Sequence, residues 1–357
     1  MCRLLLVTVA FAAVIVSAVP GCSAQDVSIP ALPGTAQVYR ELLAFSTDGR
    51  FLREIVPVSS ATGTEQLWHA RAITYVAATG KVRHVWNLQP DTWCFSATTD
   101  GRIAVISADR NRKEGRAHTF LFDTEKGRTE DIPSSWFDAD ERDPYAAISG
   151  DGLLVSAFTE SGPGDGPLVV SVYNWRTKRL VAKQATGYPA GGYPSGGVTV
   201  DGKIEFSNNR VGSDVVDPKT GRSLVSAGPS SLRSPDGAWV VDFPNLLFGD
   251  PPREIVIKNG RNGEVTGKLD LQITDAEENW VWRGAFCGTS GRFIAATNDT
   301  VQAFAIPSGK KIADIPSTTW QDTEAMKTEP AVAVACSPNG KRVAIRSGAR
   351  LTLHDLN

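Results

Sequence analysis

Three features of the sequence predict an all-β fold. Seven phrases, each an apolar run, a tight turn and a second apolar run, follow one another along the 357 residues. Their turn glycines lie about 50 residues apart, with one step of about 35, and such units are typical of four-stranded propeller blades. Apolar residues alternate with period two, and no segment has a helical period. We therefore predict a single seven-bladed β-propeller of four-stranded antiparallel blades, with turn glycines Gly49, Gly101, Gly152, Gly202, Gly237, Gly291 and Gly340.

Residues 1–24 have the pattern of a signal peptide. Arg3 precedes an apolar stretch from Leu4 to Val19, and small residues close it. The run is shorter than the about 20 apolar residues of a membrane-spanning helix. Pro20 and Gly21 then interrupt it, so the sequence predicts an exported chain.

Two processing outcomes fit these residues. The stretch VPGCSA resembles a bacterial lipobox, which makes Cys22 a candidate lipidation site. Alternatively, a signal peptidase could cut after Ala24. Both outcomes place the protein outside the cytoplasm, secreted or lipid-anchored at the cell envelope. Residues 25–33 are then a flexible tether, and 34–357 form the propeller.

A second turn signal follows in most units, as in Thr79-Gly80-Lys81 and Ser308-Gly309-Lys310. It predicts an outer hairpin in every complete unit, between the third and fourth strands. The last unit ends after its third strand. Residues 34–40 (GTAQVYR) precede the first inner strand, and we expect them to supply the missing strand. A ring closed by this N-terminal strand has no exposed edge at that point.

The third strands carry a family resemblance. TFLFDTEKGR, DVVDPKTGR, EIVIKNGRNGE and LTLHDLN resemble diverged WD-repeat strands, which end in Asp or Asn, here Asp123, Asp217, Asn259 and Asp355. The Gly-His dipeptide is missing, and Phe122, Val216, Lys258 and His354 stand where that family has tryptophan. The resemblance is therefore closest to diverged bacterial exported propellers, and it implies the fold without a partner.

Long segments between strands fall on one side of the predicted ring, opposite the hairpin turns. Length variation on one side is typical of a binding site built on a scaffold. Trp136 and Trp282 abut predicted strands, so we expect these two most readily to pack between blades. Eight aromatic residues in or beside the long segments are the candidate binding residues: Trp136, Phe137, Tyr188, Tyr193, Phe248, Trp280, Trp282 and Trp320.

The charged residues and the histidines argue against nucleic-acid binding, metal binding and histidine-based catalysis. The net charge of −2 does not favour a nucleic-acid partner. The acidic stretch 138–143 lacks the glycine and spacing of an EF-hand loop, so we predict no metal and no cofactor. His69, His84, His118 and His354 map to third or fourth strands, away from the long segments.

The cysteines give little. After export, Cys94, Cys287 and Cys336 remain, without CxxC spacing. Facing sheets pack about 10 Å apart, which exceeds the usual Cα separation in a disulfide. We therefore expect buried thiols that act as small hydrophobic residues.

The sequence thus favours a non-catalytic extracytoplasmic scaffold, a monomeric propeller that recognises a protein or peptide and for which a glycan is a second ligand class. Its contact with a membrane would come only through a lipid at Cys22. The alternative is a carbohydrate-active or quinoprotein-like enzyme that uses loop carboxylates such as Asp138, Asp140 or Glu277.

Overall fold

Strands dominate the computed structural model, and η1 (Ser134–Trp136) is the helix among the residues that it describes. Those residues are 27–29, 42–62, 65–90, 92–108, 118–137, 145–160, 167–189, 194–198, 203–208, 212–216, 223–227, 231–242, 255–271, 281–289, 291–297, 300–315, 332–347 and 350–356.

The strands form seven four-stranded antiparallel sheets. Six of them are blades of four consecutive strands. Blade 1 is β2 (Leu42–Phe45), β3 (Phe51–Thr62), β4 (Glu65–Val76) and β5 (Lys81–Pro90); blade 2 is β6 (Thr92–Ala97), β7 (Ile103–Ala108), β8 (His118–Asp123) and β9 (Arg128–Asp131); blade 3 is β10 (Tyr145–Ile148), β11 (Leu154–Glu160), β12 (Pro167–Asn174) and β13 (Leu180–Pro189). Blade 4 is β14 (Pro194–Val198), β15 (Ile204–Asn208), β16 (Gly212–Val216) and β17 (Ser223–Ala227); blade 5 is β18 (Leu232–Arg233), β19 (Trp239–Asp242), β20 (Val256–Asn259) and β21 (Val265–Lys268); blade 6 is β22 (Val281–Phe286), β23 (Arg292–Thr297), β24 (Val301–Ala305) and β25 (Lys311–Ile315).

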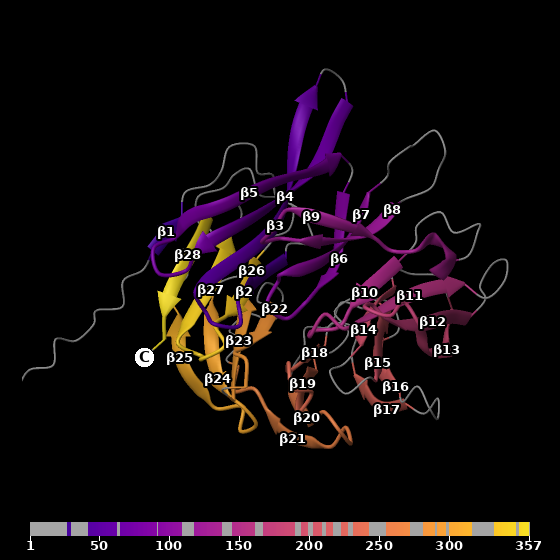
Figure 1. Ribbon diagram of the computed structural model, residues 1–357. Coiled ribbons are helices and arrows are strands. Elements are labelled where there is room, and N and C mark those ends of the chain that lie inside the picture. The colour runs from indigo at the N-terminus through magenta and orange to yellow at the C-terminus, as the bar shows by residue number, and fades with distance from the viewer. Residues whose placement is uncertain are drawn as a thin grey trace, which may run out of the picture.

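The remaining sheet is composite and joins the two ends of the chain. It contains β26 (Val332–Cys336), β27 (Arg342–Ser347) and β28 (Arg350–Asp355), and its outer strand is β1 (Val27–Ile29). β1 pairs antiparallel with β28, with Val27 opposite Leu353. β26 contacts both β2 of blade 1 and β22 of blade 6. The composite sheet therefore lies between the first and the last of the consecutive blades (Figure 1).

These sheets confirm the predicted all-β propeller of four-stranded antiparallel blades. The predicted number of blades was seven, whereas six blades of consecutive strands are present among the described residues. An N-terminal strand does complete the last sheet, but the expected location of that strand, residues 34–40, is wrong. The strand is Val27–Ile29, within the stretch assigned to the tether, while 34–40 lie outside the described residues. A three-residue strand is held by backbone bonds and is too short to show a side-chain period.

The core lies between neighbouring sheets. Ile55 of blade 1 packs with Ile106 of blade 2, and Phe293 of blade 6 packs with Ile257 of blade 5. A further cluster joins Leu52 of blade 1 to Leu353 of the composite sheet. Because each sheet buries both faces against its neighbours, removal of apolar surface from water holds the sheets together.

β3 and β4 extend beyond the rest of blade 1. Their pairing continues to Thr62 opposite Glu65, whereas β2 pairs with β3 only as far as Ile55 opposite Leu42. Figure 1 shows this part of β3 and β4 as a two-stranded ribbon that projects from the ring. The sequence did not lead us to expect this ribbon.

Cys287 and Cys336 form a disulfide, so the expectation of free thiols at these two positions is wrong. Cys287 follows β22 of blade 6, and Cys336 ends β26 of the composite sheet. Their Cα atoms are 4.7 Å apart, whereas stacked sheets lie about 10 Å apart. The spacing of stacked sheets does not apply here, because blades converge where their innermost strands meet.

Candidate binding surface

The order of strands gives the molecule two different ends. In each blade the turns between the first and second strands and between the third and fourth strands lie at one end, which we call the hairpin face. The connections between the second and third strands, and those between blades, lie at the opposite end, the loop face. This division follows from the antiparallel order β2-β3-β4-β5 and its repeats.

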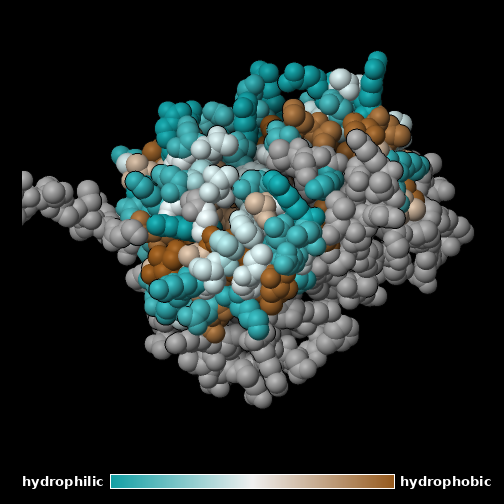
Figure 2. Space-filling view, turned by 90° about the horizontal axis from the view of Figure 1, so that it is seen from below, coloured by the Kyte–Doolittle hydropathy of each residue, from teal (hydrophilic) through white to brown (hydrophobic). Residues whose placement is uncertain are grey.

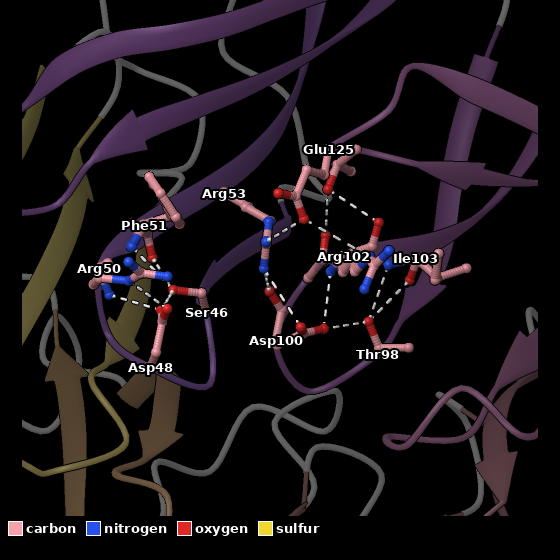
Figure 3. A network of polar contacts seen from close by, with 12 residues as sticks. Ser46, Asp48, Arg50, Phe51, Arg53, Thr98, Asp100, Arg102, Ile103 and Glu125 are labelled. Carbon is pink, nitrogen blue, oxygen red and sulfur yellow. Dashed lines mark hydrogen bonds and ion pairs between the residues drawn. The ribbon is translucent and has the colours of Figure 1, made fainter.

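The first turns of the hairpin face share one set of side-chain bonds. In blade 2, the Thr98 hydroxyl donates to the Asp100 carboxylate (2.7 Å) and accepts from the Ile103 amide (3.0 Å), while the Arg102 amide donates to the same carboxylate (3.0 Å). Figure 3 shows this turn beside the equivalent turn of blade 1. The same pattern of a hydroxyl with Asp or Asn two residues later recurs at Ser46 and Asp48, Ser149 and Asp151, Ser234 and Asp236, and Ser337 and Asn339.

These bonds explain the acidic residues of the turns. The Ser46 hydroxyl and the Arg50 amide and side chain donate to Asp48, and they hold the pKa of that carboxyl far below its usual range. Gly101 has a positive φ of 65°, a conformation that glycine adopts most readily. The carboxylates of the described first turns thus shape the backbone, which is a structural role.

Arginines connect the turns of neighbouring sheets. Arg53 of blade 1, almost fully buried, donates to the backbone carbonyl of Asp100 in blade 2 (2.7 Å) and lies 3.6 Å from Glu125 (Figure 3). Arg292 of blade 6 donates to the Gly340 carbonyl (2.9 Å), and Arg342 of the composite sheet donates to Ala77 of blade 1 (2.8 Å). These charges stabilise contacts between blades.

A buried ion pair joins blade 1 to the composite sheet. The Arg346 Nε lies 3.2 Å from Glu54 Oε1, and the Tyr75 hydroxyl donates to Glu54 Oε2 (2.8 Å). Both charged side chains are buried. Burial raises the pKa of Glu54, against the opposing effects of Arg346 and the Tyr75 hydroxyl. Since this pair lies inside an interface between sheets, its position favours a structural role.

Half of the predicted binding residues lie outside the described residues. Tyr188 and Trp282 belong to β13 and β22, and each lies at an irregularity in the register of its strand. Cys22 and the loop carboxylates Asp138, Asp140 and Glu277 are outside the described residues, as are Tyr193, Phe248, Trp280 and Trp320. Their assignment to the binding surface stays a prediction.

Trp136 and Phe137 are described, and Trp136 packs between blades 2 and 3. Its ring is buried and stacks on Tyr173 of β12, with ring centroids 3.9 Å apart and planes 3° apart. Trp175 meets the same ring edge-on at 6.0 Å. Phe137 is half-buried against this cluster. The indole of Trp136 is thus occupied in packing, as its place beside a strand led us to expect.

Sequence reasoning missed the other members of this group. Trp175, Lys178 and Leu180 surround the outer turn of blade 3, and the Lys178 ammonium lies over the Trp175 ring, 2.7 Å from its centroid. The stretch WRTKRLV at 175–181 carries three cations among apolar residues, a signal that was available. We missed it because we expected every hairpin turn to have a purely structural role.

Two further features of the described residues concern metal ligands and histidines. Among the described residues, no group of three His, Cys, Asp or Glu side chains could hold a metal ion. His69, His84, His118 and His354 lie in β4, β5, β8 and β28, the third and fourth strands predicted for them. On the face that Figure 2 shows, hydrophobic residues form separate patches within a largely hydrophilic surface.

No model of a known protein family matches the chain, and no curated protein matches its sequence. The part of the chain that the structure describes also contains no helix of the length and apolar character needed to cross a membrane.

Proposed function

We propose that this protein is a non-catalytic extracytoplasmic scaffold, a diverged WD-repeat-like propeller that recognises a protein or peptide through its loop face. In this proposal the composite sheet serves as a seventh blade that closes the ring. The binding residues are the predicted aromatic ones.

The observation that carries this proposal is the contrast between the two ends of the blades. On the hairpin face, five first turns repeat one bonding pattern, from Ser46 to Ser337. Repetition of this kind fits a role in folding. The long segments and most of the candidate aromatic residues are predicted to fall instead on the loop face, where variation in length does not disturb the sheets.

The disulfide supports the extracytoplasmic location. Cys287 and Cys336 are both buried, and their bond joins two sheets. Disulfides of this structural kind form and persist mainly in oxidising compartments. A signal peptide at residues 1–24 would deliver the chain to such a compartment.

The test is recovery of a partner from envelope extracts by the purified protein. Trp280→Ala and Trp320→Ala should each abolish recovery of a stable protein partner without lowering Tm. A matched pair of controls, Val265→Ala on β21 and Ile312→Ala on β25, also removes exposed apolar side chains and should leave recovery unchanged. Equal recovery by the loop-face variants and the parent would contradict the proposal.

The same preparations test the enzyme alternative. Turnover of a glycan that is lost in Asp138→Asn or Glu277→Gln would replace the scaffold with a carbohydrate-active enzyme, since such enzymes work through a pair of carboxyl groups.

A further inference from the structure

The hairpin end of blade 3 exposes an unusual group of apolar side chains. Leu153, between β10 and β11, is 50% exposed, and Leu180 and Val181 at the start of β13 are 52% and 58% exposed. The Trp175 amide donates to the Leu153 carbonyl (2.9 Å), and Leu180 pairs with Tyr173, so the two turns lie side by side. We call Leu153, Trp175, Leu180 and Val181 the blade 3 tip.

Cations surround this tip. Arg176, Arg179 and Lys183 are exposed, and no ion pair involves them within the described part of the chain. Lys178 pairs with Glu130 of blade 2 (3.0 Å). Two acidic groups lie near: Glu130, and Asp151, whose carboxylate accepts from Ser149 and the Leu153 amide. The tip therefore has excess positive charge, although the whole chain has a net charge of −2.

The surroundings hold the tip rigidly. Trp175 is fixed between Trp136 and the Lys178 ammonium, and Asn174 caps the turn by accepting from the Thr177 amide (2.9 Å). The exposed apolar side chains come from the turn between β10 and β11 and from the start of β13. Protruding aliphatic residues with lysine and arginine beside them, and an aromatic ring at the boundary, are typical of a surface that enters the headgroup region of a membrane.

The direction of β1 places the residues before Val27 at the hairpin face, where the blade 3 tip also lies. β28 runs from the loop face to the hairpin face, because it is the third strand of its sheet. β1 is antiparallel to β28, and Val27 lies opposite Leu353, so the chain enters β1 at the hairpin face. A lipid on Cys22, only five residues before Val27, would thus hold this face toward the membrane.

From these observations we propose that the blade 3 tip docks onto a bilayer that contains anionic lipid. Leu153, Leu180 and Val181 enter the interface, and Arg176, Arg179 and Lys183 contact the headgroups. The loop face then points away from the membrane. The proposal does not depend on recognition by the loop face.

The test uses the full chain with Cys22→Ala, which cannot carry a lipid at that position, and vesicles of phosphatidylcholine with or without phosphatidylglycerol. We expect co-sedimentation only with the anionic vesicles, weakened by salt. The variant Arg176→Gln/Arg179→Gln/Lys183→Gln should lower the partition coefficient on the order of 100-fold, or about fivefold for each cation. Leu180→Ser/Val181→Ser should lower it about tenfold.

Matched controls separate the tip from the overall charge and apolar surface. Lys81→Gln/Lys310→Gln/Lys341→Gln removes three exposed cations from other sheets, and Val265→Ser/Ile312→Ser removes two exposed apolar side chains. Both should bind nearly as well as the parent. Equal losses in tip and control variants, or no binding to anionic vesicles, would overturn the proposal.

A protein partner is the other outcome. If the tip variants lose an acidic soluble protein from a pull-down while their vesicle binding is unchanged, the tip is a protein interface and the membrane proposal is wrong. Trp280→Ala and Trp320→Ala should still bind vesicles, so failure of docking and failure of loop-face recognition are distinguishable.

Discussion

At the scale of single residues, one hydroxyl and one carboxylate or amide organise the first turn in five of the sheets. Ser149 is buried, donates to Asp151 (2.6 Å) and accepts from the Leu154 amide (3.0 Å). Asn339 takes the place of the aspartate in the composite sheet and makes the same bonds with Ser337 and the Lys341 amide. The turn therefore requires an acceptor oxygen and does not require a charge.

Ser149→Ala removes this hydroxyl and leaves the Leu154 amide without its acceptor. We expect the free energy of unfolding to fall by about 1 to 3 kcal/mol, the usual cost of an unsatisfied buried donor. Urea unfolding measures it. The control is Ser135→Ala, at an exposed position of η1. If both variants lose the same free energy of unfolding, the Ser149 hydroxyl does not stabilise the turn.

Arg346→Met should destabilise the protein at neutral pH by about 3 kcal/mol or more, because it leaves Glu54 buried without its partner. Burial raises the pKa of Glu54, and Arg346 opposes that rise. A carboxyl whose folded pKa is raised stabilises the fold below its ordinary pKa, and this stability is lost as pH rises through the folded value.

The deficit of Arg346→Met should therefore shrink toward acidic pH. Urea unfolding at several pH values measures this change. The double variant Glu54→Gln/Arg346→Met carries no buried carboxyl there, so its difference from the parent should not shrink toward acidic pH. An unchanged deficit in Arg346→Met across this range would show that Glu54 does not titrate as proposed.

At the scale of elements, each sheet packs its faces against the neighbouring sheets, and a small number of strong contacts join them. Blade 6 and the composite sheet share an apolar cluster that includes Ile294 and Val343, and the disulfide lies at one end of it. The Cys287 amide donates to the Arg292 carbonyl (3.0 Å), as the Ser46 amide donates to Phe51 in blade 1. Cys287 therefore stands where the first turn of blade 1 has its hydroxyl, and blade 6 has a covalent bond at this position.

Loss of the disulfide should destabilise the protein by about 4 kcal/mol, since the bond closes a loop with a sequence separation of 49 residues. Urea unfolding with and without a reductant measures the difference. The variant Cys287→Ala/Cys336→Ala should unfold alike in both conditions. Labelling of both thiols by a maleimide in unfolded, unreduced protein would contradict the bond.

At the scale of the whole molecule, the ring depends on three residues from one end of the chain. β1 covers the outer edge of β28 by backbone pairing over Val27, Ser28 and Ile29. Without it, β28 would present an unpaired edge, and such edges are sites of association between chains.

Deletion of residues 25–29 should lower Tm and produce oligomers. Size-exclusion chromatography with light scattering detects them. Replacement of Val27, Ser28 and Ile29 by alanine keeps the backbone pairing and should leave the protein monomeric. A monomeric deletion variant with an unchanged Tm would show that β1 does not protect this edge.

The sequence predicted the fold well because turn chemistry is local. Gly49 and Gly101 occupy positive φ values that the tight turns require, and the residues beside them alternate as strands do. The position of β1, the projecting part of β3 and β4, and the disulfide were missed because each depends on contacts distant in sequence or on backbone pairing.

Less of the binding surface could be predicted. The position of Trp136 beside a strand led us to expect packing, and its stacking on Tyr173 agrees. The blade 3 tip escaped notice because a turn that serves folding was not expected to expose Leu180 and Val181 as well. Composition alone cannot separate a turn that only supports the fold from a turn that also forms a binding surface, because both are short and polar and contain glycine or lysine.

The pairing of Val27–Ile29 with β28 also constrains how a newly made chain matures. Translation delivers β1 first and β28 last, so every intermediate on the ribosome has an open ring with one partner missing. Closure then requires contact between the most distant parts of the chain, which is slow to form. A premature stop that removes β28 would leave β1 without its partner, and the ring would stay open.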